Sequence, residues 1–293
     1  MSLRSTFLKV TAGAAAACAV LYGAAVAYLW SSQDSFIYFP TPVVVQPTLP
    51  YVSTVSIPTS DGETLVAWQA QAAPGCPTIL FLDGNAGRPE IQDGRWKRIH
   101  DSGLGFLGVY WRGYVGSTGT PSEVGFHIDA KAGLDYLKAQ GLKSSNVIVH
   151  GFSIGSGPAT RLASENDVAA LVLEAPYFSM TDLIATKVPL IPTDLLLRST
   201  YRSDKWVEQV SEPLFIAHGT FDSVIPVSQG QRLFEKAPEP KEFLSMAGSD
   251  HATLVRDGLY DHVWKFLSTY LPAQDIKTCP GLTKGQLSSA ELK

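Results

Sequence analysis

The sequence predicts an α/β protein with a mostly parallel central sheet flanked by helices, and one apolar helix ahead of that sheet. Short runs of β-branched and other apolar residues alternate along the chain with segments of helical periodicity, which is typical of parallel sheets. One of these runs breaks into a turn that places Ser153 between two glycines. With 293 residues, 45% of them hydrophobic, the chain can bury one large core and still carry extensions.

The first predicted element is an uncharged, alanine-rich segment at 10–30, which as a helix is long enough to cross a hydrocarbon core. Arg4 and Lys9 precede this segment, whereas no lysine or arginine follows it before Arg88. The positive-inside rule therefore predicts a single-pass membrane protein. Its N-terminus would be cytoplasmic and its main domain would lie on the periplasmic, extracellular or lumenal side.

Two other interpretations of this segment stay open. Ala25, Val26 and Ala27 offer a small-residue site for cleavage of a signal peptide, and Cys18 after a run of alanines resembles a lipoprotein signal. The aromatic residues within 28–39 are typical of an interfacial belt and favour a retained anchor, while the apolar stretch beyond Cys18 disfavours the lipoprotein. We expect residues 1–35 to hold a cytoplasmic stub, the anchor and a connector.

The main domain is expected to open with an antiparallel pair of strands at 51–57 and 64–68. Helices are expected at 123–140, after Ser153, and at 254–270, where apolar residues repeat at helical spacing. The strands that alternate with such helices are expected at 78–82, 106–110, 147–150, 171–173, 214–217 and 243–246.

Residues 177–205 interrupt this alternation, because they are rich in leucine and broken by Pro189 and Pro192. We interpret them as a short lid insertion, and a crossover helix with extra apolar surface is an equally open alternative. The α/β domain is then expected to span 36–271, and 272–293 to form a polar, irregular tail.

Composition excludes several classes of function. A formal net charge of -4 without any basic run argues against a nucleic-acid partner. Neither a C-x-x-C nor an H-E-x-x-H spacing supports a metal site, and Gly113, Gly116 and Gly119 lack the lysine of a phosphate-binding loop. We therefore expect no metal and no cofactor. Cys76 and Cys279 could form a disulfide in an exported domain, but two cysteines offer no spacing pattern to test, so their pairing stays open.

The turn at Ser153 has the G-x-S-x-G pattern of a nucleophile elbow, with Gly151 and Gly155 at its ends. The apolar run at 147–150 suits the strand that must precede an elbow, and 158–164 suits the helix that must follow it. A serine hydroxyl is a poor nucleophile at neutral pH, and an elbow lifts it to a place that a base can reach. Ser153 is therefore the candidate nucleophile, with an ordinary structural turn as the alternative.

The base and the acid are sought after the elbow, in loops that follow strands. Asp222 follows the strand expected at 214–217, and His251 follows the strand expected at 243–246. The order serine, acid, histidine is that of α/β-hydrolases. We take His251 as the base and Asp222 as its partner, with Asp250 as the competing carboxylate.

An oxyanion formed at Ser153 should be met by two backbone N–H groups. One belongs to Ile154, and the other is expected in the loop after Leu82, where we choose Asn85 next to Gly84. The alternative for this loop is a glycine-rich turn without a catalytic role.

Taken together, these motifs resemble the α/β-hydrolases, most closely the membrane-anchored serine hydrolases of the bud-emergence branch, which are grouped with serine-aminopeptidase-like domains. The resemblance implies acyl hydrolysis by Ser153, Asp222 and His251 without a cofactor. Besides the elbow, the matching stretches are Phe-Ile-Tyr-Phe-Pro at Phe36, Gly-Asn-Ala-Gly at Gly84, Trp-Arg-Gly-Tyr at Trp111, Pro-Ser-Glu at Pro121, Leu-Leu-Leu-Arg at Leu195, His-Gly-Thr-Phe-Asp at His218 and Ala-Pro-Glu-Pro-Lys at Ala237.

Two positions depart from the family pattern. Asp83 stands where the family usually has a histidine, and Ala252-Thr253 replaces the Asn-Asp that commonly follows the catalytic histidine. A carboxylate ~6 Å from the oxyanion would oppose it by roughly 3 kcal/mol at an effective dielectric constant of ~20. We therefore expect Asp83 to turn away, toward a cation such as Arg88 or Arg112.

The sequence thus predicts a membrane-tethered serine hydrolase that cleaves carboxylic ester or thioester bonds of small or lipid-like apolar acyl substrates through an acyl-enzyme. A serine aminopeptidase is the first rival, and it would need a carboxylate for the substrate ammonium. A noncatalytic binding or scaffold protein with the same fold is the second.

Overall fold

The structure, a computed structural model, describes residues 3–85, 92–272 and 276–283. It contains one sheet of eight strands in the order β1-β2-β4-β3-β5-β6-β7-β8. Pairs β1–β2 and β2–β4 are antiparallel and the other pairs are parallel, which confirms the mostly parallel sheet. The strands are β1 (Ser53–Pro58), β2 (Thr64–Ala70), β3 (Thr78–Leu82), β4 (Gly105–Val109), β5 (Val147–Phe152), β6 (Ala170–Glu174), β7 (Leu214–Gly219) and β8 (Lys241–Met246).

Helices cover both faces of this sheet. Leu80 lies against Gly133 of α3, whereas the ring of the adjacent Phe81 packs edge-on against Trp96 of α2, 5.3 Å between centroids. Because consecutive strand residues point to opposite faces, α3 and α2 cover opposite faces. The helices are α1 (Leu3–Ile37), α2 (Asp93–Asp101), α3 (Glu123–Ala139), α4 (Ser156–Ser164), α5 (Met180–Lys187), α6 (Thr193–Leu196), α7 (Ser203–Trp206), α8 (Val227–Lys236), α9 (Leu259–Tyr270) and α11 (Pro280–Thr283).

The central strands are buried along their whole length because both faces are covered. Every residue of β3, β4 and β6 is buried, whereas the edge strand β8 is mostly half-buried. This pattern explains the uninterrupted apolar runs in the sequence, since a parallel strand with two covered faces has no solvent face on which to alternate.

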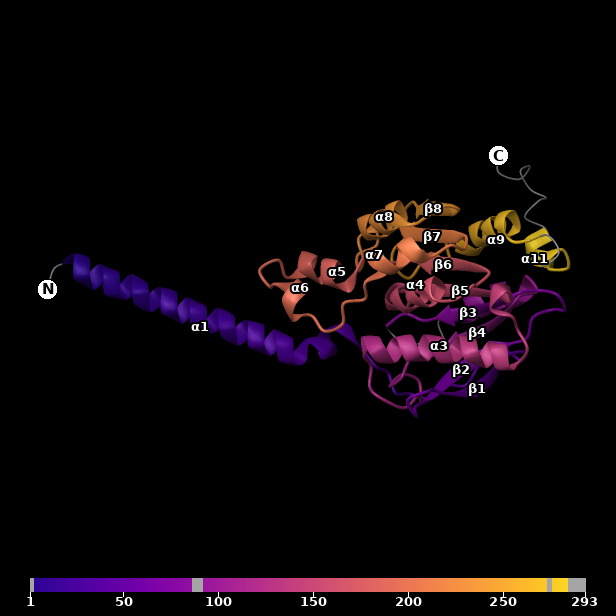
Figure 1. The fold of residues 1–293 in the computed structure, drawn as a ribbon, viewed down its shortest axis with the longest axis horizontal. Helices are drawn as coiled ribbons and strands as arrows, with labels where there is room; N and C mark the ends of the chain where they lie inside the picture. The colour runs from indigo at the N-terminus through magenta and orange to yellow at the C-terminus, as the bar shows by residue number, and fades with distance from the viewer. Residues whose placement is uncertain (1–2, 86–91, 273–275, 284–293) are drawn as a thin grey trace.

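Helix α1 projects from the domain as a long rod, with α5 and α6 beside its C-terminal part (Figure 1). Its segment Phe7–Ile37 is long and apolar enough to cross a membrane, and the most apolar part of it is not buried by the rest of the protein. An uncleaved anchor and a signal sequence both meet this description.

The expected helix at 254–270 begins later than its apolar periodicity suggested. Residues 251–258 form turns, and the helix starts only at Leu259, after Gly258 with φ at 101°. Such a positive φ favours glycine and cannot continue a helix. The turns leave His251 in a loop rather than beside a helix.

The C-terminal segment differs from the expected irregular tail over its described residues 276–283. Ile276, Cys279 and Leu282 are buried, and the backbone N–H of Gly281 donates to the carbonyl of Ser102 at 3.0 Å. These apolar side chains recur every three residues and therefore face the domain together. The sequence analysis missed this spacing because the segment as a whole is polar.

A disulfide joins Cys279 of this segment to Cys76, with 5.5 Å between the Cα atoms and 203 positions between the two residues in sequence. The Cα distance is within the range of unstrained disulfides. The bond fixes the segment before α11 to the loop between β2 and β3, and it is of the kind that persists in oxidising compartments.

Removal of this disulfide should destabilise the protein. We expect the variant with Cys76→Ser and Cys279→Ser to lose about 3 kcal/mol of unfolding free energy, because a long loop of the unfolded chain is no longer closed. Urea denaturation of the purified full-length protein in detergent measures the loss. Cys18→Ser, which removes an exposed thiol, is the matched control and should unfold at the wild-type midpoint. Equal midpoints for the double variant and this control would contradict the prediction.

Candidate active site

A strained turn between β5 and α4 carries Ser153. Its φ is 53°, in the left-handed region that residues with a side chain rarely adopt. The turn is also too tight for side chains at its two glycines: an added Cβ would lie 2.5 Å from Ala159 at Gly151, and 2.2 Å from the carbonyl oxygen of Leu82 at Gly155. The G-x-S-x-G pattern is therefore a requirement for space around the serine.

Ser153, Asp222 and His251 lie together in one hydrogen-bonded chain. Nε2 of His251 is 2.8 Å from Oγ of Ser153, and Nδ1 is 2.7 Å from Oδ2 of Asp222. The three residues come from loops after β5, β7 and β8, which meet at the carboxyl edge of the sheet because those strands are parallel. The geometry is that of a nucleophile, a base and an orienting acid.

Asp222 is held in its ionised form. Burial opposes its charge, but hydrogen bonds from His218 and His251, together with the backbone N–H of Ile225, bring the pKa of Asp222 well below its ordinary value. The backbone N–H groups of Val224 and Ile225 donate to its Oδ1 at 2.9 and 2.8 Å. A fixed anion at this position orients the His251 ring and would stabilise its protonated form.

The competing carboxylate, Asp250, does not face the imidazole of His251. Its Oδ1 accepts from the backbone N–H of His251 at 2.7 Å and from that of Ser223 at 3.0 Å. Asp250 therefore shapes the histidine loop and ties it to the acid loop.

His218 contacts the acid although the sequence placed it only at the start of the acid loop. The buried ring lies 2.8 Å from the carbonyl of Ile225 and 3.3 Å from Oδ2 of Asp222 through its Nε2. Asp222 thus has two histidine neighbours, and only one of them reaches the serine. The sequence of this loop gave no sign that His218, a buried strand residue, would also contact the Asp222 carboxylate.

The loop after β3 passes directly against the nucleophile. An added Cβ at Gly84 would lie 2.9 Å from the Phe152 ring and 3.5 Å from Cβ of Ser153. The side chain of Asn85 is fully engaged: Nδ2 donates to the carbonyl of Ile37, while Oδ1 accepts from the backbone N–H of Phe39 at 3.1 Å and from Tyr114 Oη at 2.7 Å.

This arrangement leaves backbone groups to face a reacting oxygen. Within the described part of the chain the backbone N–H of Asn85 has no acceptor. Ile154 lies in the first turn after the serine, where N–H groups lack partners within the helix. The loop is held by the end of α1 and the segment that follows it, so the N-terminal helix is joined to the expected oxyanion loop.

The expected pairing of Asp83 with Arg112 is wrong. Its carboxylate does not reach Arg112, which pairs instead with Asp61 and Asp129 at 2.8 Å each, and the other expected cation, Arg88, lies outside the described residues. Oδ1 of Asp83 accepts from the N–H of Gly84 at 2.7 Å and from Nε2 of Gln92 at 3.0 Å. Burial raises the pKa of Asp83 to about 6, although Gly84, Arg95 and Gln92 oppose this shift.

A buried charged cluster lies behind the elbow, and sequence analysis did not find it. Nη1 of Arg95 is 2.8 Å from Oε2 of Glu174 and 3.1 Å from Tyr260 Oη, and Nε2 of His150 is 3.3 Å from the same carboxylate oxygen. Burial opposes the charge of Glu174, yet Arg95 and His150 lower its pKa to about 2. The available signal was a glutamate that ends an apolar strand; Arg95 lies in a helix rich in charged residues and did not stand out.

A cavity of about 670 Å³ opens over the serine and the histidine. Ser153, His251 and Asn85 contribute polar atoms to its wall, and most of the remaining wall is apolar. Apolar wall residues come from the end of α1 and from the expected lid: Phe36, Ile37, Phe39, Met180, Leu183 and Ile184. The cavity can therefore receive an apolar group next to the nucleophile.

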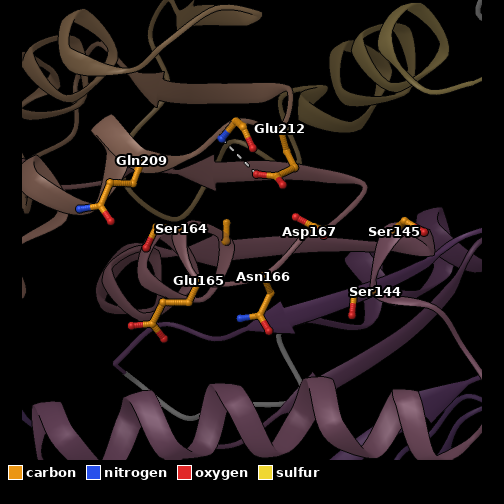
Figure 2. A pocket seen from close by; sticks show the side chains of 10 residues that line it. Ser144, Ser145, Ser164, Glu165, Asn166, Asp167, Gln209 and Glu212 are labelled. Carbon is orange, nitrogen blue, oxygen red and sulfur yellow. Dashed lines mark hydrogen bonds between the residues drawn. The ribbon is translucent and has the colours of Figure 1, made fainter.

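A second hollow, of about 590 Å³, lies at the opposite edge of the sheet, where β5, β6 and β7 begin (Figure 2). Its wall is polar and includes the carboxylates of Glu165, Asp167 and Glu212. Its lining does not include Ser153, His251 or Asp222. Over the described residues, neither this hollow nor any other cluster of His, Cys, Asp and Glu could hold a metal ion.

Comparison with known proteins finds relatives of this chain in sequence. No family model matches the chain. Rv2307c, an uncharacterized protein of Mycobacterium tuberculosis, is 31% identical over 239 residues, which cover 80% of this chain and 85% of Rv2307c. The human alpha/beta hydrolase domain-containing protein 17B is 29% identical over 222 residues, 73% of this chain and 74% of its own length.

Solved structures share the fold. The esterase Pf2001 of Pyrococcus furiosus superposes with a TM-score of 0.65 at 21% identity, over 80% of this chain and 97% of that one. With the elbow and the strand order, this similarity shows that the chain has the α/β-hydrolase fold. At 31% identity over most of both chains, the protein belongs to one family with the mycobacterial protein Rv2307c.

Proposed function

We propose that this protein is a serine hydrolase that cleaves carboxylic ester or thioester bonds of apolar acyl substrates through an acyl-enzyme. The observation that carries the proposal is the hydrogen-bonded chain from Ser153 through His251 to Asp222, at 2.8 and 2.7 Å. The matching motifs favour the bud-emergence branch of the superfamily. The names of a sequence relative, the human hydrolase-domain protein, and of a structural neighbour, the Pyrococcus esterase, agree with this chemistry.

The proposed reaction has two halves. His251 Nε2 takes the proton of Ser153 as Oγ attacks the acyl carbon, and the backbone N–H groups of Ile154 and Asn85 stabilise the oxyanion. The imidazolium then protonates the departing alcohol or thiol, which leaves the acyl group on the serine. Water then attacks the acyl carbon while His251 takes one of its protons; the bond from the acyl carbon to Ser153 Oγ breaks, the imidazolium returns the proton to Oγ, and the carboxylic acid leaves. Asp222 stays ionised throughout and stabilises the imidazolium.

The cavity wall favours an esterase or thioesterase over an aminopeptidase. An aminopeptidase needs a carboxylate that meets the substrate ammonium. Among the described residues that line the cavity there is no Asp or Glu, and the side chain of Lys187 adds a positive charge. The wall would therefore repel an ammonium and accept an apolar acyl chain.

We also propose that α1 is a retained anchor, with a cytoplasmic N-terminus and the catalytic domain exported. The second half of the helix is tied to the domain: Tyr22 Oη, within the apolar segment, donates to the carbonyl of Leu190 at 2.7 Å, and Asp34 pairs with Arg198 at 2.8 Å. The disulfide between Cys76 and Cys279 suits an oxidising compartment on the far side of the membrane.

Fluorophosphonate labelling of the full-length protein in membranes tests the reaction. Ser153→Ala should abolish labelling, and His251→Ala and Asp222→Asn should each slow it by about 1,000-fold or more, because the hydroxyl loses its oriented base. Matched controls are His262→Ala, on an exposed part of α9, and Asp250→Asn, next to the histidine. Both should label near the wild-type rate. A folded wild-type protein that does not label would support the noncatalytic alternative instead.

Loss of the Asn85 side chain should lower turnover rather than substrate binding. Asn85→Ala removes the contacts to Ile37, Phe39 and Tyr114 and releases the N–H that faces the oxyanion. We expect kcat for a soluble ester to fall about tenfold to a hundredfold with little change in KM. Asn166→Ala, whose side chain bonds the carbonyl of Leu162 at the opposite edge of the sheet, is the control. A rise in KM alone would contradict the expected role.

Asp83→Asn should change stability but not turnover. The pKa of Asp83 is about 6 in the folded protein and ~3.9 in the unfolded chain, so the fold favours the protonated carboxyl. Its full contribution to stability is present below pH ~3.9 and is lost as the pH rises through about 6. The variant should therefore match the wild type near pH 4 and exceed its unfolding free energy by up to about 3 kcal/mol above pH 6. Urea midpoints between pH 4 and 8 measure the difference.

The turnover of Asp83→Asn tests whether the Asp83 carboxylate is held away from the oxyanion or opposes it. Because Gln92 and the Gly84 N–H hold the carboxylate and Arg95 offsets it, we expect kcat of Asp83→Asn to stay near the wild-type value. A large gain in kcat would mean that the carboxylate opposes the oxyanion after all.

A further inference from the structure

A second apolar cavity, of about 410 Å³, lies between the C-terminal part of α1 and the helices α5 and α6. Leu29 and Trp30 of α1 form one wall, and Val188 and Leu196 belong to the other. This cavity and the one that holds Ser153 share four lining residues, so the two adjoin: Phe36, Ile37, Ile184 and Lys187. We call these two adjoining cavities, which lie between the helix that can cross a membrane and the nucleophile, the apolar groove.

Hydrogen bonds fix the two walls of this groove to each other. Gln33 of α1 donates through Nε2 to the carbonyl of Leu196 at 3.3 Å and accepts through Oε1 from the backbone N–H of Arg198 at 2.7 Å. The Arg198 guanidinium pairs with Asp34 at 2.8 Å and lies 5.5 Å from the Trp30 ring. These hydrogen bonds and this ion pair therefore fix the position of α1 against the segment at 177–205, and with it the shape of the groove.

Exposed apolar side chains lie in the groove wall, at Trp30 and Phe36, and directly beside its lining residues in sequence, at Leu190 and Leu195. Leu190 and Leu195 are 82% and 84% exposed, and Trp30 and Phe36 on α1 are about half exposed. Figure 1 shows α5 and α6 on the side of the domain from which α1 projects. If α1 spans the bilayer, these side chains lie at its surface, where an acyl chain can leave the lipid phase without crossing water.

One cation stands where the two cavities meet. Lys187 at the end of α5 is the only lysine or arginine among the described residues that line either cavity. Its side chain is exposed and has no ion-pair or hydrogen-bond partner in the described part of the chain. An unpaired ammonium at the rim of an otherwise apolar groove attracts an anionic group attached to an apolar chain.

Resting on the proposed function, we propose that the substrates are acyl esters of anionic membrane lipids. The acyl chain lies in the groove between α1 and the helices α5 and α6, the carbonyl carbon lies at Ser153 Oγ, and Lys187 pairs with the headgroup phosphate. Hydrolysis breaks the acyl–oxygen bond, with water supplying a hydroxyl to the released fatty acid and a proton to the lipid alcohol. This assigns both an entry route and a headgroup preference.

The headgroup preference is tested with the full-length protein in mixed micelles. We compare kcat/KM for phosphatidylglycerol and phosphatidylcholine with identical acyl chains, and expect the wild type to prefer phosphatidylglycerol about tenfold. Lys187→Glu should abolish that preference and Lys187→Arg should keep it. Lys205→Glu reverses another exposed charge, on α7, and should behave as the wild type. Equal ratios for Lys187→Glu and Lys205→Glu would overturn the assignment of Lys187.

The route is tested by obstruction. Val188 lines only the outer cavity, and Val188→Trp should lower the ratio of long-chain to short-chain ester hydrolysis about tenfold. Val124→Trp, at an exposed position of α3, is the matched control. An unchanged ratio in Val188→Trp would overturn the groove as the entry route. Absence of ester hydrolysis and of fluorophosphonate labelling in the folded wild type would instead overturn the proposed function itself.

Discussion

The close approach of the elbow to the end of β3 is the constraint on which the rest of the site depends. An added Cβ at Gly155 would lie 2.2 Å from the carbonyl oxygen of Leu82, so the elbow turn meets the end of β3 with no side chain between them. This contact holds Ser153 at its positive φ and brings the loop of Gly84 and Asn85 against the nucleophile. The sheet order then supplies the acid and the base, because β7 and β8 end at the same edge.

Beneath this contact lies a buried pair of opposite charges, which is costly to remove from water. Arg95 and Glu174 are both buried and pair at 2.8 Å, and Tyr260 and His150 complete their surroundings. Removing one member would leave an unpaired charge in the core, which is far more destabilising than losing an exposed pair. The guanidinium also lies 4.4 Å from the Phe81 ring centroid and 5.8 Å from that of Phe152, the residue before the nucleophile. The cluster thus supports the floor of the elbow.

Much of the fold was predictable from the sequence because buried parallel strands are uninterrupted apolar runs. The expected strand at 78–82 has the bounds of β3, and the antiparallel opening pair and the helix at 123–140 are present with small shifts. The three residues expected to form the triad are also brought together, since strand-end loops of a parallel sheet converge.

What sequence reasoning missed depends on contacts between segments far apart in the chain. The partner of Asp83 is Gln92 and not Arg112, because Arg112 is engaged by two other carboxylates. Residues 276–283 pack on the domain although their composition is polar, because one disulfide and a few apolar side chains suffice. His218 and Glu174 were hidden in apolar strands, where a titratable residue has no periodic signature.

Through the hydrogen bonds of Asn85 to Ile37 and Phe39, the end of α1 does more than attach the domain: it also holds the oxyanion loop. A protease that cuts the chain before residue 36 would shed a domain that still carries both contacts. A cut just after residue 39 would shed a domain without them, and the oxyanion loop would have to hold its shape through Tyr114 alone. Release of the domain from its bilayer and loss of its chemistry are thus separated by only a few residues of chain.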